Sequence, residues 1–203
     1  MLIFLERKLV IYAPPKTGTT ALHIALGSHA DIALRGPAKH FSVRRAKKLV
    51  LPMLEGLGSP LPEGFAVIRE PIDWLHSWYR YRTRKEVPAG KSSAHLTFDA
   101  FVESYLSDDP EICAKLGKQS RFCTGEGPLS ITHHFAHEHM DRAVGFLSDR
   151  LEIEFALDWV NESPTMPLEL SSPNRAKLMD HFKDDYRIYE HALKNSLRFE
   201  PPR

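Results

Sequence analysis

The order of apolar and polar residues along the chain predicts short buried strands that alternate with helices. Residues 9–12 and 65–68 are continuous apolar runs, which is typical of parallel strands buried on both faces. Each run precedes a segment with helical apolar spacing, at residues 21–26 and 72–84. The repeated order of strand and helix predicts crossover units and a parallel sheet.

The remaining pattern predicts further elements around that sheet. Expected strands occupy residues 31–35, 129–136 and 153–157. Expected helices occupy residues 43–54, 98–106, 110–116, 140–151 and 172–195, and loops fall at 56–64, 87–97 and 117–128. The predicted fold class is α/β, with three layers in which helices flank a central, mainly parallel sheet.

Length and composition are those of an ordinary globular protein. The 203 residues suit one domain, residues 1–203, that buries roughly 70% of the surface of its unfolded chain. A formal net charge of +1 gives no global positive field for nucleic-acid binding. The two cysteines, Cys113 and Cys123, show neither metal-site spacing nor a disulfide framework. No apolar run is long enough to cross a membrane. We therefore expect a cytoplasmic protein without a nucleic-acid or membrane partner.

The segment at residues 12–20, which reads YAPPKTGTT, has the composition of an anion-binding loop between a strand and a helix. Gly18 permits a tight backbone turn, and the helix's first amides and dipole favour an anion at the same place. Lys16 supplies a compact cation. The alternative is an ordinary turn in which threonines cap the helix. The candidate binding residues of this loop are Pro15, Lys16, Thr17, Gly18, Thr19 and Thr20.

The order of residues in this loop differs from the nucleotide-triphosphate loop G-x-x-x-x-G-K-[ST]. Lys16 precedes Gly18, and no glycine lies upstream of them. The run Pro-Lys-Thr-Gly-Thr-Thr instead resembles the 5′-phosphosulfate loop of the sulfotransferases, which use 3′-phosphoadenosine 5′-phosphosulfate (PAPS). The resemblance implies a P-loop-like fold and a phosphosulfate held by this loop.

A second segment, residues 65–80, reads FAVIREPIDWLHSWYR and combines a strand, an Arg-x-Pro turn and a helix. Arg69 is expected at the carboxyl end of the strand, where open α/β sheets bind ligands, and its planar fork suits a phosphate dianion. Ser77 lies about two helical turns further on and offers a hydroxyl donor. The segment resembles the sulfotransferase element for the 3′-phosphate, which implies that Arg69 and Ser77 bind that group. The alternative is that Arg69 caps the sheet and Ser77 is an ordinary helix residue.

Residues at the strand ends bear on the rival interpretation as a P-loop kinase. Phosphoryl-transfer enzymes with P-loops need an acidic residue on a neighbouring strand to hold magnesium. Here the expected strands near residues 32–34 and 65–68 run into Arg35 and Arg69. These cations favour an anion, and we expect no metal.

Weaker similarity to the sulfotransferases extends over most of the chain. The matching segments are Q-S-x-F at residues 119–122, E-H-M-D at 138–141, N-E-S-P at 161–164 and D-D-Y-x-x-Y at 184–189. The chain looks short for the family, so insertions that cover the acceptor are expected to be small or missing.

Sulfuryl transfer requires a base for the acceptor and stabilisation of the departing phosphate. Lys16, beside the bridging oxygen, is the candidate for the second task. His40, just after the second predicted strand and next to Lys39, is the candidate base because imidazole titrates near neutral pH. His23, one turn into the loop helix, or a carboxylate is the alternative.

Two other groups of residues have competing interpretations. The histidines at 133, 134, 137 and 139 suggest zinc, but no HExxH motif is present and no ligand geometry is defined. Trp78 and Tyr81 can stack a nucleobase, although their spacing is more typical of the core and rim of a helix.

The sequence therefore predicts a PAPS-dependent sulfotransferase acting on a hydroxyl or amine of a small molecule or carbohydrate, with 3′-phosphoadenosine 5′-phosphate (PAP) as product. A P-loop kinase and a catalytically inactive module that binds PAP or PAPS are the alternatives. The acceptor and the oligomeric state stay open.

Overall fold

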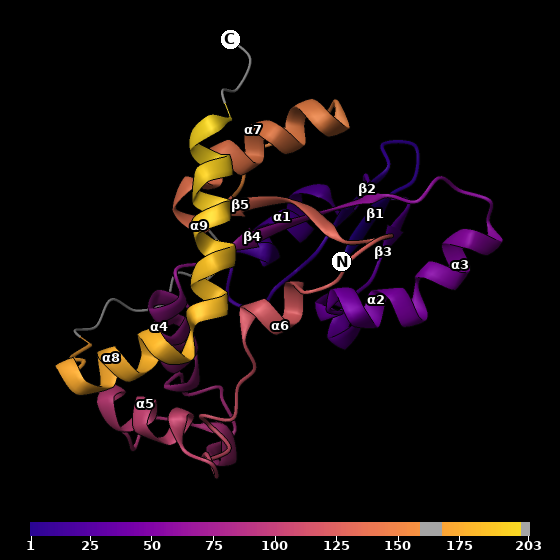
Figure 1. The fold of residues 1–203 in the computed structure, drawn as a ribbon. Coiled ribbons are helices and arrows are strands. Elements are labelled where there is room, and N and C mark those ends of the chain that lie inside the picture. The colour runs from indigo at the N-terminus through magenta and orange to yellow at the C-terminus, as the bar shows by residue number, and fades with distance from the viewer. Residues whose placement is uncertain (159–167, 200–203) are drawn as a thin grey trace.

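The computed structural model describes residues 1–158 and 168–199, which form an α/β fold around a five-stranded mixed sheet (Figure 1). Across the sheet the order is β3-β1-β2-β4-β5. β2, β4 and β5 run parallel, whereas β1 is antiparallel to both of its neighbours. The strands are β1 (Leu2–Phe4), β2 (Leu9–Ile11), β3 (Ile32–Ala33), β4 (Glu63–Ile68) and β5 (Ile131–Ala136).

The prediction of a mainly parallel sheet is therefore wrong. β1 was not predicted from the sequence, and it precedes β2 by a connection of only residues 5–8. A connection this short joins antiparallel strands, because a parallel pair needs a crossover of a dozen or more residues. β1 also inserts between β2 and β3, so β3 is not the immediate neighbour of β2.

Helices lie on both sides of the sheet. The α-helices are α1 (Thr19–Leu26), α2 (Val43–Leu49), α3 (Leu51–Gly56), α4 (Pro71–Arg82), α5 (Phe98–Leu106), α6 (Gln119–Cys123), α7 (Met140–Leu151), α8 (Ser172–His181) and α9 (Lys183–Arg198). Short 3₁₀ turns, η1 (Gly36–His40), η2 (Ala89–Lys91) and η3 (His137–His139), complete the described elements. No helix within the described ranges has the length and apolarity needed to cross a bilayer.

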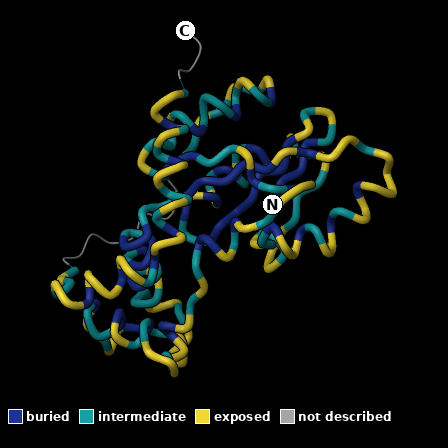
Figure 2. The backbone as a smooth tube through the Cα atoms, in the orientation of Figure 1, coloured by how far each residue is buried: buried dark blue, intermediate teal, exposed yellow. Residues whose placement is uncertain are grey.

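Two apolar clusters sandwich the sheet, because alternate strand residues point to opposite faces. On one face, Val10 and Ile68 pack with residues of α2, α3, α6 and α9. On the other, Ile11 and Val67 pack with residues of α1 and α7. Figure 2 shows the strands as the most continuously buried part of the tube. The result is three layers, with the sheet in the middle.

A third apolar cluster lies beside the sheet rather than on it. It joins α4, α5 and α8 through Leu75, Phe101 and Leu178, and these helices project together from one end of the molecule (Figure 1). Trp74 packs edge-on against Phe182, with ring centroids 6.3 Å apart. Phe182 is fully buried and separates α8 from α9. This cluster fixes α4, the helix that follows the end of β4.

Several element predictions need correction. The helix expected at 43–54 divides near Pro52 into α2 and α3, and that at 172–195 divides at Phe182 into α8 and α9. Residues 110–116 form a turn instead of a helix, and α6 lies within the expected loop 117–128. Residues 153–157 form no strand: Ile153, Phe155 and Leu157 pack against the α1–α7 cluster. Alternate residues of this segment are partly buried, as the apolar pattern predicts, but the segment does not pair with a strand of the sheet. The expected N-E-S-P turn at residues 161–164 lies outside the described residues.

Candidate functional site

Three segments meet at the carboxyl ends of the parallel strands. β2 leads into the loop at residues 12–18, β4 into Arg69, and β5 into His137. A guanidinium nitrogen of Arg69, Nη1, donates to the Lys16 carbonyl at 3.3 Å. The loop and the Arg69 element are thus in direct contact at the edge where open α/β folds bind ligands.

The loop bends sharply at two residues with left-handed backbone conformation. Lys16 has φ 68° and Gly18, the residue before α1, has φ 74°. A side chain on Gly18 would be strained at this φ, and its Cβ would lie 2.9 Å from the Met140 Cε. Glycine therefore lets the loop pack against the start of α7, beside His137. Holding lysine at positive φ costs about 1–3 kcal/mol, so surrounding contacts must fix Lys16.

The threonine hydroxyls brace this loop from within. Thr17 and Thr19 are buried, and both donate to the Pro14 carbonyl, at 2.9 and 3.5 Å. Thr20 is exposed and its hydroxyl accepts from Lys39 Nζ at 3.2 Å. The loop's rigidity thus comes from two of the hydroxyls that the sequence analysis assigned to phosphate. The contact between Thr20 and Lys39 lies on the exposed side of the loop.

The carbonyls of Pro15 and Lys16 accept hydrogen bonds from residues that follow β4. Trp74 Nε1 donates to the Pro15 carbonyl at 3.0 Å, next to the bond from Arg69 to Lys16. The Lys16 ammonium lies 4.4 Å from the ring centroid of Tyr81 and 5.9 Å from that of Trp78. Burial, followed by the positive charges of Arg84 and Arg69, lowers the pKa of Lys16 to about 8. An anion placed here would relieve the repulsion among these cations.

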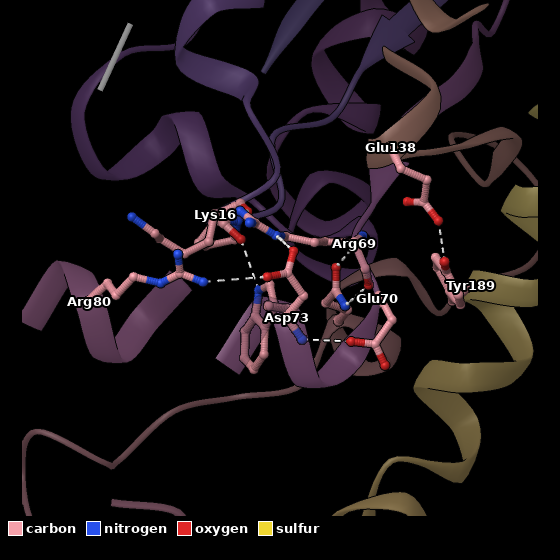
Figure 3. Close-up of polar contacts among 10 residues, drawn as sticks. Lys16, Arg69, Glu70, Asp73, Arg80, Glu138 and Tyr189 are labelled. Atoms are coloured by element: carbon pink, nitrogen blue, oxygen red, sulfur yellow. Dashed lines mark hydrogen bonds and ion pairs between the residues drawn. The ribbon is translucent and has the colours of Figure 1, made fainter. Parts of the chain in front are cut away.

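Arg69 is fixed through its side chain and its backbone (Figure 3). Its Nε donates to Asp73 Oδ2 at 2.5 Å, and the side chain is 19% exposed. Its backbone N–H donates to Gln119 Oε1 at 3.0 Å, and its carbonyl accepts from Gln119 Nε2 at 2.8 Å. Within residues 1–158 and 168–199, hydrogen bonds occupy Nε and Nη1 of Arg69 but not Nη2.

α4 presents a polar face toward Arg69. Asp73, Ser77 and Arg80 recur at helical spacing, and residues three or four apart lie on the same face. Arg80 Nη2 lies 3.6 Å from Asp73 Oδ1, so Asp73 stands between two guanidinium groups (Figure 3). Ser77 is 5% exposed. Glu70 caps the helix by accepting from the Asp73 N–H at 2.6 Å.

A buried carboxylate positions Gln119. Its role was not predicted from the sequence. Asp185 of α9 is fully buried and accepts from the Gln119 N–H at 2.7 Å and the Ser120 hydroxyl at 2.6 Å. It thereby holds the first turn of α6, whose Gln119 clamps the Arg69 backbone. The weak family similarity included residues 119–122 and 184–189, but only the fold shows that they act on each other.

Two tyrosines of α9 connect the same helix to the sheet edge. Tyr186 donates to Glu70 Oε1 at 2.6 Å, and Tyr189 donates to Glu138 Oε1, just after β5 (Figure 3). Glu138 belongs to the similar segment at 138–141. Four segments that are far apart in the sequence, those that contain Glu70, Gln119, Glu138 and Asp185, therefore meet at the carboxyl ends of β4 and β5.

His40 contacts the beginning of the loop. Its Nδ1 lies 2.7 Å from the Ala13 carbonyl; since a carbonyl only accepts, Nδ1 carries the hydrogen. Burial, opposed by this hydrogen bond and assisted by the charge of Lys39, lowers the pKa of His40 below its ordinary value. A neutral ring in this tautomer leaves Nε2 as a proton acceptor. η1 thus brings His40 to the loop although β1 separates β3 from β2.

His23 is already engaged. Its Nε2 lies 2.9 Å from the α-amino group of Met1, which also donates to the Lys39 carbonyl at 2.8 Å. Burial, then the nearby positive charges, lowers the pKa of His23 to about 3. This contact makes His23 a weaker candidate base than His40.

The histidines near β5 separate in the structure. His133 pairs with Glu63 Oε2 at 2.9 Å, while the ring of His134 lies 5.2 Å from that of His191. His137 instead lies against Gly18, and burial followed by Arg69 lowers its pKa. From the sequence, His137 is a candidate only as one of four possible zinc ligands and not as part of the anion site, although it directly follows an expected strand. Trp78 and Tyr81 form a partly exposed rim under Lys16.

Comparisons of the chain with protein-family models, curated proteins and solved structures gave no match.

Proposed function

We propose that this protein is a PAPS-dependent sulfotransferase with a P-loop-like fold, which moves the sulfuryl group to a hydroxyl or amine of a small-molecule or carbohydrate acceptor. The observation that carries the proposal is the contact between two anion-binding elements. The Arg69 guanidinium donates to the Lys16 carbonyl across the ends of the adjacent parallel strands β2 and β4. A nucleotide phosphorylated at both its 5′ and 3′ positions needs two such elements side by side.

The loop supports binding of the 5′-phosphosulfate. The loop that contains Lys16 leads directly into the N-terminus of α1 at Thr19, and Lys39 donates to the Thr20 hydroxyl in the first turn of that helix. A helix N-terminus favours anions, and the mutual repulsion of Lys16, Arg69 and Arg84 makes added negative charge favourable.

The Arg69 element supports binding of the 3′-phosphate. Asp73 and the Lys16 carbonyl engage Nε and Nη1 of the guanidinium, and no residue in the described part of the chain accepts from Nη2, which can donate to a ligand. Arg80 approaches the same carboxylate from α4, and Ser77 shares that helix face. A phosphate dianion accepts several such charge-assisted hydrogen bonds.

The residues allow an in-line displacement. His40 Nε2 takes the proton of the acceptor hydroxyl as its oxygen bonds to sulfur, and the bond from sulfur to the bridging oxygen of PAPS breaks. The electron pair leaves with the 5′-phosphate of PAP. Lys16 stabilises the charge that develops on this leaving group, which requires its ammonium to leave the Tyr81 ring for the bridging oxygen.

The acidic residues at this edge support the proposal over a P-loop kinase. Glu70 accepts from the Asp73 amide and the Tyr186 hydroxyl, and Asp73 lies between two arginines. Both carboxylates are therefore engaged by the protein, whereas a kinase holds magnesium with such a group. A module that binds PAP without turnover is the remaining alternative.

Turnover of PAPS separates these possibilities. The assay is release of PAP from PAPS, without magnesium, over a panel of phenols, alcohols, amines and carbohydrates. We expect acceptor-dependent PAP release that Lys16→Ala lowers about 10²–10³-fold, with Lys48→Ala, at an exposed position of α2, as the control. ATP consumption that requires magnesium would favour the kinase; PAP binding without release over the panel would favour the inactive module.

A further inference from the structure

Three side chains with metal-ligating atoms meet away from the sheet edge, beside the cluster of α4, α5 and α8. His95 lies before α5, and Glu111 and Cys113 lie after it. The ligand atoms of these residues are all within 4.8 Å of one another. The grouping depends on the fold, because α5 separates the histidine from the other two residues.

The distances suit one small cation. His95 Nε2 is 2.8 Å from Glu111 Oε2, and Cys113 Sγ is 3.9 Å from the same oxygen. Zinc bonds of about 2.0 Å to nitrogen and oxygen and about 2.3 Å to sulfur place tetrahedral ligand atoms roughly 3.3–3.6 Å apart. The observed distances bracket this separation, so modest side-chain rotation suffices to close the site.

The backbone around these residues is anchored independently of any metal. The Glu111 N–H donates to the Ser104 hydroxyl of α5 at 2.9 Å. On the other side, the Tyr79 hydroxyl of α4 donates to the Leu96 carbonyl, next to His95, at 2.6 Å. Supporting hydrogen bonds of this kind preorganise ligands. Cys113 is 2% exposed and faces the cluster, whereas His95 is exposed.

The charges of the three groups match a divalent cation. The Cys113 thiol donates to the Glu111 carboxylate at 3.9 Å. A metal ion displaces that thiol proton to solvent, which gives a thiolate and a carboxylate against two positive charges. Arg82, which acts electrostatically on Cys113, then stands beside a neutral site.

We propose that His95, Glu111 and Cys113 form a Zn²⁺ site with a fourth position open to water. The mixed nitrogen, oxygen and sulfur donors are those that zinc accepts. The ion would tie residues 92–97 to residues 107–114 across α5. This goes beyond the proposed sulfotransferase activity and does not depend on it.

The test is a zinc titration of the chelator-treated protein in competition with a chromophoric chelator. We expect one equivalent of zinc per chain. Removing a ligand should weaken binding by more than about 100-fold, since loss of an outer-shell partner alone costs about 10–100-fold. The variants are Cys113→Ser and His95→Ala. The control is His133→Ala, which removes a histidine of β5 that is paired with Glu63 at 2.9 Å, and it should leave zinc affinity unchanged.

Cobalt substitution identifies the sulfur ligand. Co²⁺ should produce a thiolate-to-metal charge-transfer band that Cys113→Ser abolishes. Absence of zinc binding, unchanged affinity in His95→Ala, or a cobalt band that survives Cys113→Ser would each overturn the site. If Cys113→Ser fails to fold, the exposed His95 gives the decisive variant.

Discussion

Replacing Gln119 tests whether the α6 clamp holds Arg69 in place. The side-chain amide of Gln119 accepts from the Arg69 N–H at 3.0 Å and donates to the Arg69 carbonyl at 2.8 Å. Gln119 is 2% exposed. Methionine has a similar volume and flexibility but makes neither hydrogen bond, so Gln119→Met isolates the clamp from the packing.

The magnitude follows from the two groups left without partners. A buried donor or acceptor that loses its partner costs about 1–3 kcal/mol. For Gln119→Met we expect the free energy of unfolding to fall by about 2–4 kcal/mol, because water or a shift of α6 compensates part of the loss. With a urea dependence of about 2 kcal/mol per molar, the middle of the typical range, the midpoint should move down by roughly 1–2 M.

Urea unfolding and calorimetric titration with PAP together check this prediction. Because Arg69 loses its fixed position, PAP affinity should fall at least about tenfold, while AMP affinity stays unchanged. Arg121→Met, at an exposed position of the same helix, is the control and should change stability by less than about 0.5 kcal/mol. A Gln119→Met protein as stable as this control, with unaltered PAP affinity, would refute the clamp.

Three further perturbations test the chemistry and the electrostatics. Lys16→Ala should lower single-turnover PAP release about 10²–10³-fold with a much smaller change in PAP affinity, since the lysine acts on developing charge; equal losses in both would contradict its role. His40→Ala should lower turnover roughly 10²–10⁴-fold while PAP binding persists, and the wild-type rate should fall at a pH below about 6.5, because burial lowers the pKa of His40. If the rate of His40→Ala still falls at acid pH as the wild-type rate does, another group, His23 or a carboxylate, acts as the base. Burial lowers the pKa values of His76 and His134 to about 4. Below about pH 6.5 the unfolded chain therefore binds more protons than the folded chain, and the free energy of unfolding should fall as the pH is lowered from about 6.5 to 4. A urea midpoint that stays constant over that range would show that these rings are not buried in their neutral form.

The periodic pattern predicted the elements that carry a strong local signal. The apolar run at 65–68 became β4, and the helix expected from residue 72 became α4, because Pro71 and the Glu70 cap fix its beginning. The pattern failed where partners decide the outcome. Ile153, Phe155 and Leu157 bury alternate side chains against α1 and α7 without pairing, and a residue pattern does not distinguish these two situations.

The candidate site was accessible from the sequence only in part. Lys16 and Arg69 lie in segments whose composition indicates anion binding, and the fold brings them into contact. Arg69 is held by Gln119, which lies 50 residues away in the sequence. Gln119 is held in turn by Asp185, which lies a further 66 residues away. Such contacts between distant segments have no local signature. Similarly, β1 changes the sheet from parallel to mixed although its three residues form a run too short for a periodicity argument.

Calorimetric titration with PAP and AMP, without magnesium, on the wild type and Arg69→Ala tests the central claim most directly. Two charge-assisted hydrogen bonds to the 3′-phosphate, at about 1.5–3 kcal/mol each, should contribute about 3–6 kcal/mol, so the wild type should bind PAP roughly 150- to 20,000-fold more tightly than AMP. In Arg69→Ala this preference should nearly disappear, with AMP affinity retained. Equal affinities of the wild type for PAP and AMP would contradict the assignment of Arg69 to the 3′-phosphate and, with it, the proposed use of PAPS.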